Sequence, residues 1–99
     1  PRFSARYGGE EFAIICPGEA QVAVNAALEE IRLEIGSRVL KRRSTNEDLG
    51  NITVSAGFAV RHPGESAHSL MERADAALYA SKHGGRNQVS MAEPLSDAA

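Results

Sequence analysis

The chain has 99 residues, of which 42% are hydrophobic and 24% charged, and its net charge at pH 7 is −2. This size and composition are typical of one small globular domain, or part of one, and leave no room for two. A single cysteine, Cys16, excludes an internal disulfide and a zinc site built from several cysteines. The slight negative charge argues against a strongly basic nucleic-acid binder, so no nucleic-acid polymer is expected as a partner.

The first predicted element is a β-hairpin. Residues 12–16 form a continuous apolar run, which is typical of a strand buried on both faces. Residues 5–7 can form its partner strand, with Gly8 and Gly9 between the two. Glycine adopts the positive φ of a two-residue hairpin turn without a Cβ clash, so these two glycines are predicted to form the turn.

The middle of the chain predicts a helix and then a polar segment. Apolar residues recur at helical spacing between residues 19 and 35, which indicates an amphipathic helix. Four cations follow within six positions: Arg38, Lys41, Arg42 and Arg43. Such a cluster can contact phosphate, but the turn-forming residues around it favour a solvated loop between two ordered segments.

The last third predicts a strand, a second helix and a short final strand. Alternating apolar residues indicate a strand over 52–60, a helical period runs over 66–83, and residues 87–91 close the domain. The order β-β-α-β-α-β predicts an α+β fold with helices packed on a mainly antiparallel sheet. The domain is expected to cover residues 1–91 and to be followed by a frayed tail, 92–99.

The segment Arg-Tyr-Gly-Gly-Glu-Glu-Phe, residues 6–12, places two carboxylates directly after a glycine turn. Successive strand residues point to opposite faces, so Glu10 and Glu11 are expected to differ in role. Gly8 and Gly9 let a large ligand such as a nucleotide approach the backbone. A carboxylate beside an open phosphate site suits Mg²⁺, which is often shared with substrate phosphates. Taken alone, these residues favour a simpler interpretation, an acidic hairpin tip that keeps the domain soluble.

The second helix carries a polar face. Asp75, Tyr79, Lys82 and Arg86 fall within about 60° of one another if the helix extends so far. An ordinary solvated face is the alternative, and its surface contacts would contribute little to stability. Asn87, which follows this face, is expected to fix the turn after the helix.

Residues 6–12 resemble the signature of the GGDEF domain, the diguanylate cyclase family, in its Glu-for-Asp variant. Two later segments resemble the family in the same order: Ile-Thr-Val-Ser-Ala-Gly at 52–57, and Ala-Asp-Ala-Ala-Leu-Tyr at 74–79 with the Lys82, Gly85, Arg86 and Asn87 that follow. The resemblance covers a little more than half of such a domain, its C-terminal part. It implies that a first strand, early helices, a metal-binding aspartate and guanine-recognising residues precede this segment.

The resemblance also implies an activity for the intact domain, the condensation of two GTP molecules into cyclic di-GMP with release of pyrophosphate. By position, Glu10 would bind metal and serve the 3′-hydroxyl attack, and Glu11 would assist. Lys82 and Arg86 match the phosphate-contacting pair. Two Mg²⁺ ions are expected per active site, with Mn²⁺ as an alternative. Catalysis is expected in a homodimer whose parent protein carries an N-terminal sensor or receiver module.

Three further expectations concern regulation, activity and location. Arg2 stands where the family's inhibitory Arg-x-x-Asp motif has its aspartate, so that site is expected to be absent. The 99-residue chain alone is expected to make no cyclic di-GMP. The alternative to an enzyme is a GGDEF module that binds GTP or cyclic di-GMP as a signalling receptor without turnover. A cytoplasmic location is expected, whether or not the parent protein is anchored in a membrane.

Overall fold

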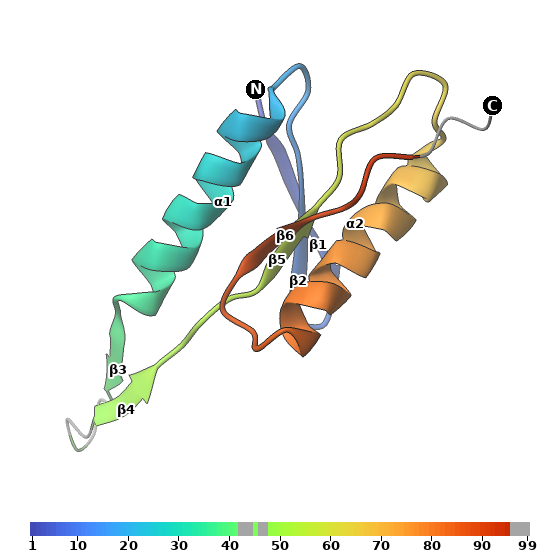
Figure 1. Ribbon diagram of the computed structural model, residues 1–99. Coiled ribbons are helices and arrows are strands. Elements are labelled where there is room, and N and C mark those ends of the chain that lie inside the picture. Colours follow the sequence, from blue (N-terminus) through green and yellow to red (C-terminus); the bar gives the residue numbers. More distant parts are fainter. Residues whose placement is uncertain (42–44, 46–47, 96–99) are drawn as a thin grey trace.

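The computed structural model describes residues 1–41, 45 and 48–95. Its elements are β1 (Phe3–Gly8), β2 (Glu11–Ile15), α1 (Gln21–Gly36), β3 (Val39–Lys41), β4 (Asp48–Asn51), β5 (Ala56–Phe58), α2 (Ala67–His83) and β6 (Val89–Met91). The two helices flank the β5–β6 pair, and the β1–β2 hairpin lies behind it (Figure 1). The predicted α+β fold is confirmed, with β3 and β4 as additional strands.

The described strands form three two-stranded sheets. β1–β2 and β3–β4 pair antiparallel, as predicted for most of the sheet, whereas β5–β6 pair parallel. A parallel pair needs a long crossover connection, and α2 supplies it between β5 and β6. The strand predicted over 52–60 is shorter than expected, since only Ala56–Phe58 has a strand partner.

The described ends of the polar segment after α1 form two paired strands, β3 and β4, where the sequence predicted only a solvated loop. Val39 pairs with Asn51, and the two short strands continue beyond the lower end of α1 (Figure 1). The Asn51 side-chain amide donates to the Gly36 carbonyl oxygen at 2.8 Å, which ties β4 to the end of the helix. Arg42 and Arg43 lie outside the described residues.

The core lies where α2 packs on β5 and β6. Phe58 and Ala77 are the buried hydrophobic residues of the described chain, at 7% and 5% exposed. A Cβ on Gly57 would lie 2.0 Å from the Leu78 backbone nitrogen, so helix and strand touch through their backbones. The fully buried Ser81 hydroxyl donates to the Ala56 carbonyl oxygen at 2.7 Å and lies 2.7 Å from the Ser90 hydroxyl.

A buried ion pair fixes the loop that leads from β5 into α2. The Glu65 carboxylate accepts from the Arg73 guanidinium through two nitrogens, each at 2.8 Å. It also accepts from the Ser69 hydroxyl at 2.7 Å and the His62 backbone N–H at 3.1 Å. The Arg73 hydrogen bonds, followed by the Ser69 and His62 donors, hold the pKa of Glu65 far below its ordinary value despite the opposing effect of burial. Sequence patterning gave no sign of this pair.

The start of the predicted tail is hydrogen-bonded to the domain. The Ala92 backbone N–H donates to the Phe58 carbonyl oxygen at 2.7 Å, and the Leu95 N–H donates to the His62 ring at 3.0 Å. Residues 96–99 lie outside the described part of the chain. The boundary at residue 92 therefore stays a prediction.

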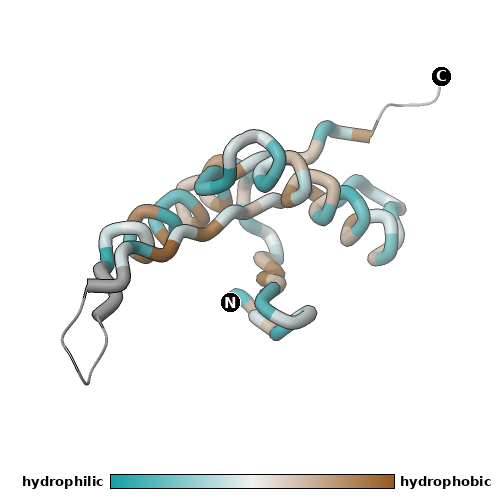
Figure 2. The backbone as a smooth tube through the Cα atoms, turned by 90° about the horizontal axis from the view of Figure 1, so that it is seen from below, coloured by the Kyte–Doolittle hydropathy of each residue, from teal (hydrophilic) through white to brown (hydrophobic). Residues whose placement is uncertain are grey.

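The β1–β2 hairpin is far more exposed than its sequence predicts. Phe12 is 72% exposed, Ile14 44% and Ile15 62%, so β2 is not the doubly buried strand expected from its apolar run. The physical reason is that β1 and β2 pair with no third strand in the described structure, and Figure 2 shows the hairpin set apart from the helices.

The chain as a whole exposes an unusually large surface for its size. Its accessible surface is 7460 Å², against about 5,500 Å² for a compact monomer of this mass. The Cα radius of gyration is 15.8 Å, compared with about 13 Å for a compact domain of this length. Neither of the two described helices is long and apolar enough to cross a membrane.

Candidate functional site

The turn of the β1–β2 hairpin lies one residue later than predicted. Gly8 pairs with Glu11, so Gly9 and Glu10 form the turn, after a bulge between Arg6 and Gly8. The prediction that Gly8 and Gly9 have positive φ was also wrong. Among the described glycines, positive φ occurs at Gly18, Gly50, Gly64 and Gly85. The Arg6 guanidinium donates to the Gly9 carbonyl oxygen at 2.6 and 3.0 Å, so a side chain braces this turn.

The two signature glycines leave open space at the hairpin tip. A Cβ built on Gly8 or Gly9 would have no heavy atom within 4 Å. The packing of the described chain therefore does not require glycine at either position. The open space beside Gly8 and Gly9 leaves room for a ligand to approach the backbone, which is the role predicted for both residues.

The two signature carboxylates have different surroundings. Glu10 is exposed in the turn, whereas Glu11 begins β2 and is partly buried. Glu11 Oε2 lies 3.4 Å from Lys82 Nζ on α2, 71 residues further along the chain. Both side chains are about one-third exposed, so water screens the pair and it contributes little stability. The Glu11–Lys82 pair matters because it places the signature next to the cationic end of α2.

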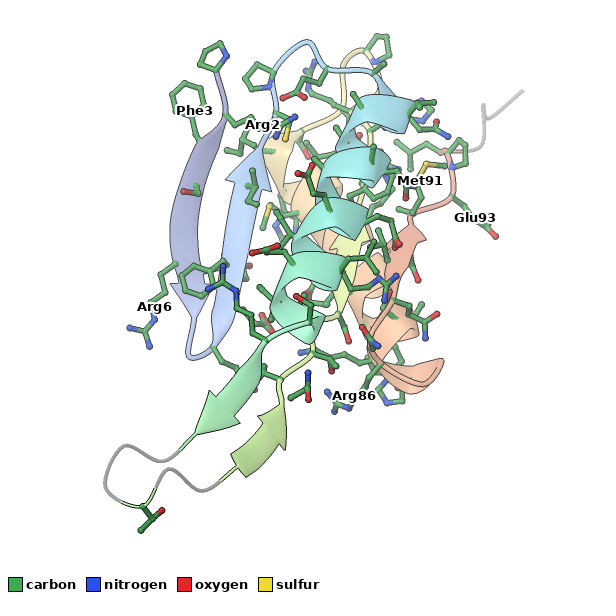
Figure 3. The ribbon with its side chains drawn as sticks, turned by 90° about the vertical axis from the view of Figure 1, so that its left-hand side faces the viewer. Arg2, Phe3, Arg6, Arg86, Met91 and Glu93 are labelled. Carbon is green, nitrogen blue, oxygen red and sulfur yellow. The ribbon has the colours of Figure 1, made fainter. Side chains whose placement is uncertain are left out.

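The cationic end of α2 is divided between helix and turn. α2 ends at His83, so Arg86 does not share the helical face of Asp75 and Tyr79, which sequence spacing allowed only if the helix extended that far. Arg86 instead lies in the following turn with φ of 62°, and its backbone N–H donates to the Ser81 carbonyl oxygen at 2.9 Å. In Figure 3, Arg6 and Arg86 both lie below Arg2, Arg6 on the hairpin and Arg86 in the turn after α2.

Asn87 fixes the turn, as expected, through contacts that the sequence did not reveal. Its backbone N–H donates to Ser55 Oγ at 3.0 Å, and its side-chain oxygen accepts from Arg32 Nη1 at 3.1 Å. Sequence reasoning missed Arg32, because the residue looks like an ordinary polar position on an amphipathic helix. Only its spacing from Glu29, which favours a helical ion pair, is visible in the sequence.

Arg2 lies at the opposite end of the hairpin from the signature turn (Figure 3). Its guanidinium makes two hydrogen bonds of 2.7 Å to the Glu19 carboxylate. These bonds raise the pKa of Arg2 and lower that of Glu19. The residue at the predicted inhibitory position is therefore engaged within the chain, and the absence of that site stays a prediction.

The donor set at the hairpin tip suits a magnesium ion shared with a nucleotide. No group of three or more His, Cys, Asp or Glu side chains gathers anywhere in the described residues, so a cage made of protein ligands alone does not exist there. Mg²⁺ is commonly held by one or two carboxylates together with water and substrate phosphates. Glu10 and Glu11 provide that number of carboxylates, and Lys82 Nζ lies 3.4 Å from Glu11 Oε2.

Comparison with known proteins gives a consistent result. Residues 2–88 match the family model described as diguanylate cyclase, GGDEF domain. The diguanylate cyclase VdcA of Vibrio cholerae is 40% identical over 84 residues, which is 85% of this chain and 25% of the relative. The chain thus spans about a quarter of that curated relative's length.

Two solved structures are similar to this chain. The GGDEF domain of DgcB from Caulobacter crescentus, in complex with c-di-GMP, is 73% identical with a TM-score of 0.91 over 95% of this chain and 53% of that one. The active GGEEF domain of a diguanylate cyclase from Vibrio cholerae is 27% identical, with a TM-score of 0.79 over 96% of this chain and 58% of that one.

Proposed function

This chain belongs to the GGDEF domain family of diguanylate cyclases, and we propose that it forms the triphosphate-holding and carboxylate-bearing part of a GTP-condensing active site. The intact domain joins two GTP molecules into cyclic di-GMP. In each of two steps a 3′-hydroxyl oxygen bonds to the α-phosphorus of the other nucleotide, the hydroxyl loses its proton, and pyrophosphate leaves. The observation that carries the proposal is the 3.4 Å approach of Glu11 Oε2 to Lys82 Nζ.

The residues of this chain divide the work between two elements. Lys82 and Arg86 hold the triphosphate through charge-assisted hydrogen bonds. Gly8 and Gly9 leave space for the nucleotide beside the backbone. Glu10, exposed in the turn, serves the attacking 3′-hydroxyl, with Glu11 assisting.

Mg²⁺ fits the same carboxylates. Glu10 would hold it together with phosphate oxygens, with Glu11 assisting, and the ion would stabilise negative charge on the attacking and leaving oxygens. Two ions per site and the use of Mn²⁺ remain part of the proposal.

Catalysis requires two copies of the domain. Each domain holds one GTP, so the 3′-hydroxyl of one nucleotide reaches the α-phosphate of the other only when two sites face each other. The exposed position of Glu10 supports this arrangement, because nothing in the described chain encloses the tip. An N-terminal sensor or receiver module in the full-length protein would control the pairing.

A receptor that binds a guanine nucleotide without turning it over is the second candidate. It is favoured by one finding, the c-di-GMP complex formed by the similar domain of DgcB. Both acidic residues of the signature are present here, Glu10 and Glu11, and this favours the enzyme.

The two candidates are separated by assaying the full-length protein with GTP and Mg²⁺ and measuring cyclic di-GMP by chromatography. We expect turnover, and we expect Glu10→Gln to abolish it while leaving GTP affinity nearly unchanged, because the carboxylate acts mainly on the transition state. Glu72→Gln is the matched control, since this exposed glutamate of α2 pairs with His68. Tight nucleotide binding by the wild type without any product would move the assignment to the receptor.

The chain by itself is expected to make no cyclic di-GMP. It covers 53% of the similar GGDEF domain of DgcB, and no group of three or more possible metal ligands gathers among its described residues. Clear turnover by the isolated 99 residues would contradict this expectation.

A further inference from the structure

The turn between α2 and β6 has an unusual backbone. Arg86 and Asn87 are consecutive residues with φ of 62° and 49°. Side-chain-bearing residues seldom adopt the left-handed region, and two in succession persist only where their surroundings determine the conformation. The direction in which the Arg86 side chain leaves the backbone therefore depends on whatever holds this turn.

Two segments distant in the sequence hold Asn87 in place. Ser55, just before β5, accepts the Asn87 backbone N–H at 3.0 Å. Arg32 on α1 donates from Nη1 to the Asn87 side-chain oxygen at 3.1 Å, across 55 residues of sequence. Asn87 thus joins α1 to the turn that carries Arg86.

Arg32 is itself oriented by its neighbour on the helix. The Glu29 carboxylate accepts from Arg32 Nη2 at 2.9 Å and from Nε at 3.3 Å. The Arg32 side chain is 20% exposed. With these two nitrogens directed at Glu29, the remaining terminal nitrogen, Nη1, is left facing Asn87.

We propose that Arg32 is a positioning residue of the nucleotide site, which acts through Asn87 to hold the turn that presents Arg86 to the triphosphate. The inference rests on the proposed function, because it takes Arg86 as a phosphate ligand. It adds a residue on α1, an element that carries none of the predicted ligands.

The test measures binding of 3′-deoxy-GTP with Mg²⁺ to the full-length protein by calorimetry. This nucleotide lacks the attacking hydroxyl, so it binds without reacting. Arg32→Ala is expected to weaken binding about two- to tenfold, the range of one hydrogen bond's net contribution. Arg38→Ala is the matched control, because Arg38, two residues beyond the end of α1, forms an ion pair with Glu34 of that helix at 2.7 Å. The control is expected to bind normally.

A double-mutant cycle tests the route through Asn87. Asn87→Gly removes the acceptor but tolerates the left-handed backbone, so Arg32→Ala should have no further effect in that background. Amide hydrogen exchange supplies a readout independent of the nucleotide: exchange in residues 84–88 should accelerate in Arg32→Ala and not in Arg38→Ala. Arg32→Lys, which keeps a donor, should recover part of the affinity.

The outcomes separate the inference from the function on which it rests. If Arg86→Ala weakens binding and Arg32→Ala does not, the positioning role is wrong and the phosphate site stands. Additive losses in the cycle with Asn87→Gly would also overturn the positioning role. If Arg86→Ala itself binds the nucleotide normally, both the phosphate role of Arg86 and the inference fall.

Discussion

The packed unit of α2, β5 and β6 and the exposed β1–β2 hairpin make an instructive contrast. The packed unit contains the buried residues Phe58, Ala77 and Ser81, whereas Phe12 in the hairpin is 72% exposed. The cations proposed for phosphate belong to the packed unit and its following turn, and the carboxylates belong to the hairpin. The proposed site therefore combines residues of a packed unit with residues of an exposed hairpin. Substitutions in these two halves should have different effects on stability.

Gly57→Ala should have the largest effect on the packed unit. The new Cβ would lie 2.0 Å from the Leu78 backbone nitrogen, so α2 must move away from β5. We expect a loss at the upper end of the roughly 1–3 kcal/mol typical of overpacking. For a domain of this size that lowers Tm by about 10–20 °C, measurable by circular dichroism.

Gly9→Ala is the matched control in the hairpin. Its Cβ would meet no heavy atom within 4 Å, and Gly9 is not among the positive-φ glycines. We expect a change in unfolding free energy within about 0.5 kcal/mol. A large loss there would remove the contrast between the two halves.

Acid should weaken the packed unit through Glu65. Its pKa is lowered in the folded chain, chiefly by the hydrogen bonds from Arg73. The stabilisation is therefore present above the ordinary pKa of 4.5 and is lost progressively as the pH falls below it. Glu65→Gln should lower the unfolding free energy at neutral pH and converge with the wild type in acid. Parallel pH profiles for the two proteins would contradict this account.

Ser81→Ala should produce a smaller loss. The substitution removes the donor to the Ala56 carbonyl oxygen and the partner of the Ser90 hydroxyl, both inside the core. An unsatisfied buried group costs about 1–3 kcal/mol, and chemical denaturation would report the loss. Ser37→Ala is the control, because that hydroxyl bonds the Glu34 carbonyl on an exposed turn. Equal losses for both serines would show that burial is not the cause.

The sequence predicted the packed unit more accurately than the hairpin. Helical periodicity located α2 closely, because its apolar face does pack against β5 and β6. The apolar run of β2 predicted burial that the structure does not have, since periodicity reports which residues can be buried and not whether a covering element is present. The turn at Gly9 and Glu10 was misplaced because the bulge before Gly8 and the brace from Arg6 have no signal in spacing.

The candidate site was predicted in part. The signature and the cations of α2 were identified by resemblance, and the structure brings Glu11 and Lys82 together although 71 residues separate them. Arg32 and the Glu65–Arg73 pair were not predicted, because a charged residue on a helix surface looks the same in sequence whether or not it reaches a distant loop. Such contacts depend on tertiary arrangement, which a single sequence does not encode in its local pattern.

Lys82→Ala should have a small effect on stability and a clear effect on the site. The pair with Glu11 is about one-third exposed at 3.4 Å, so its loss should cost no more than about 1 kcal/mol. The same change removes a charge-assisted phosphate contact, typically worth about 1.5–3 kcal/mol, or roughly ten- to a hundredfold in GTP affinity. Denaturant unfolding and calorimetry on the full-length protein would measure both, with Arg38→Ala as the control for charge. A variant that binds GTP normally would show that Lys82 does not hold the triphosphate. A variant that unfolds as readily as Gly57→Ala would show instead that the two halves depend on this contact for stability, and the division between scaffold and site would no longer hold.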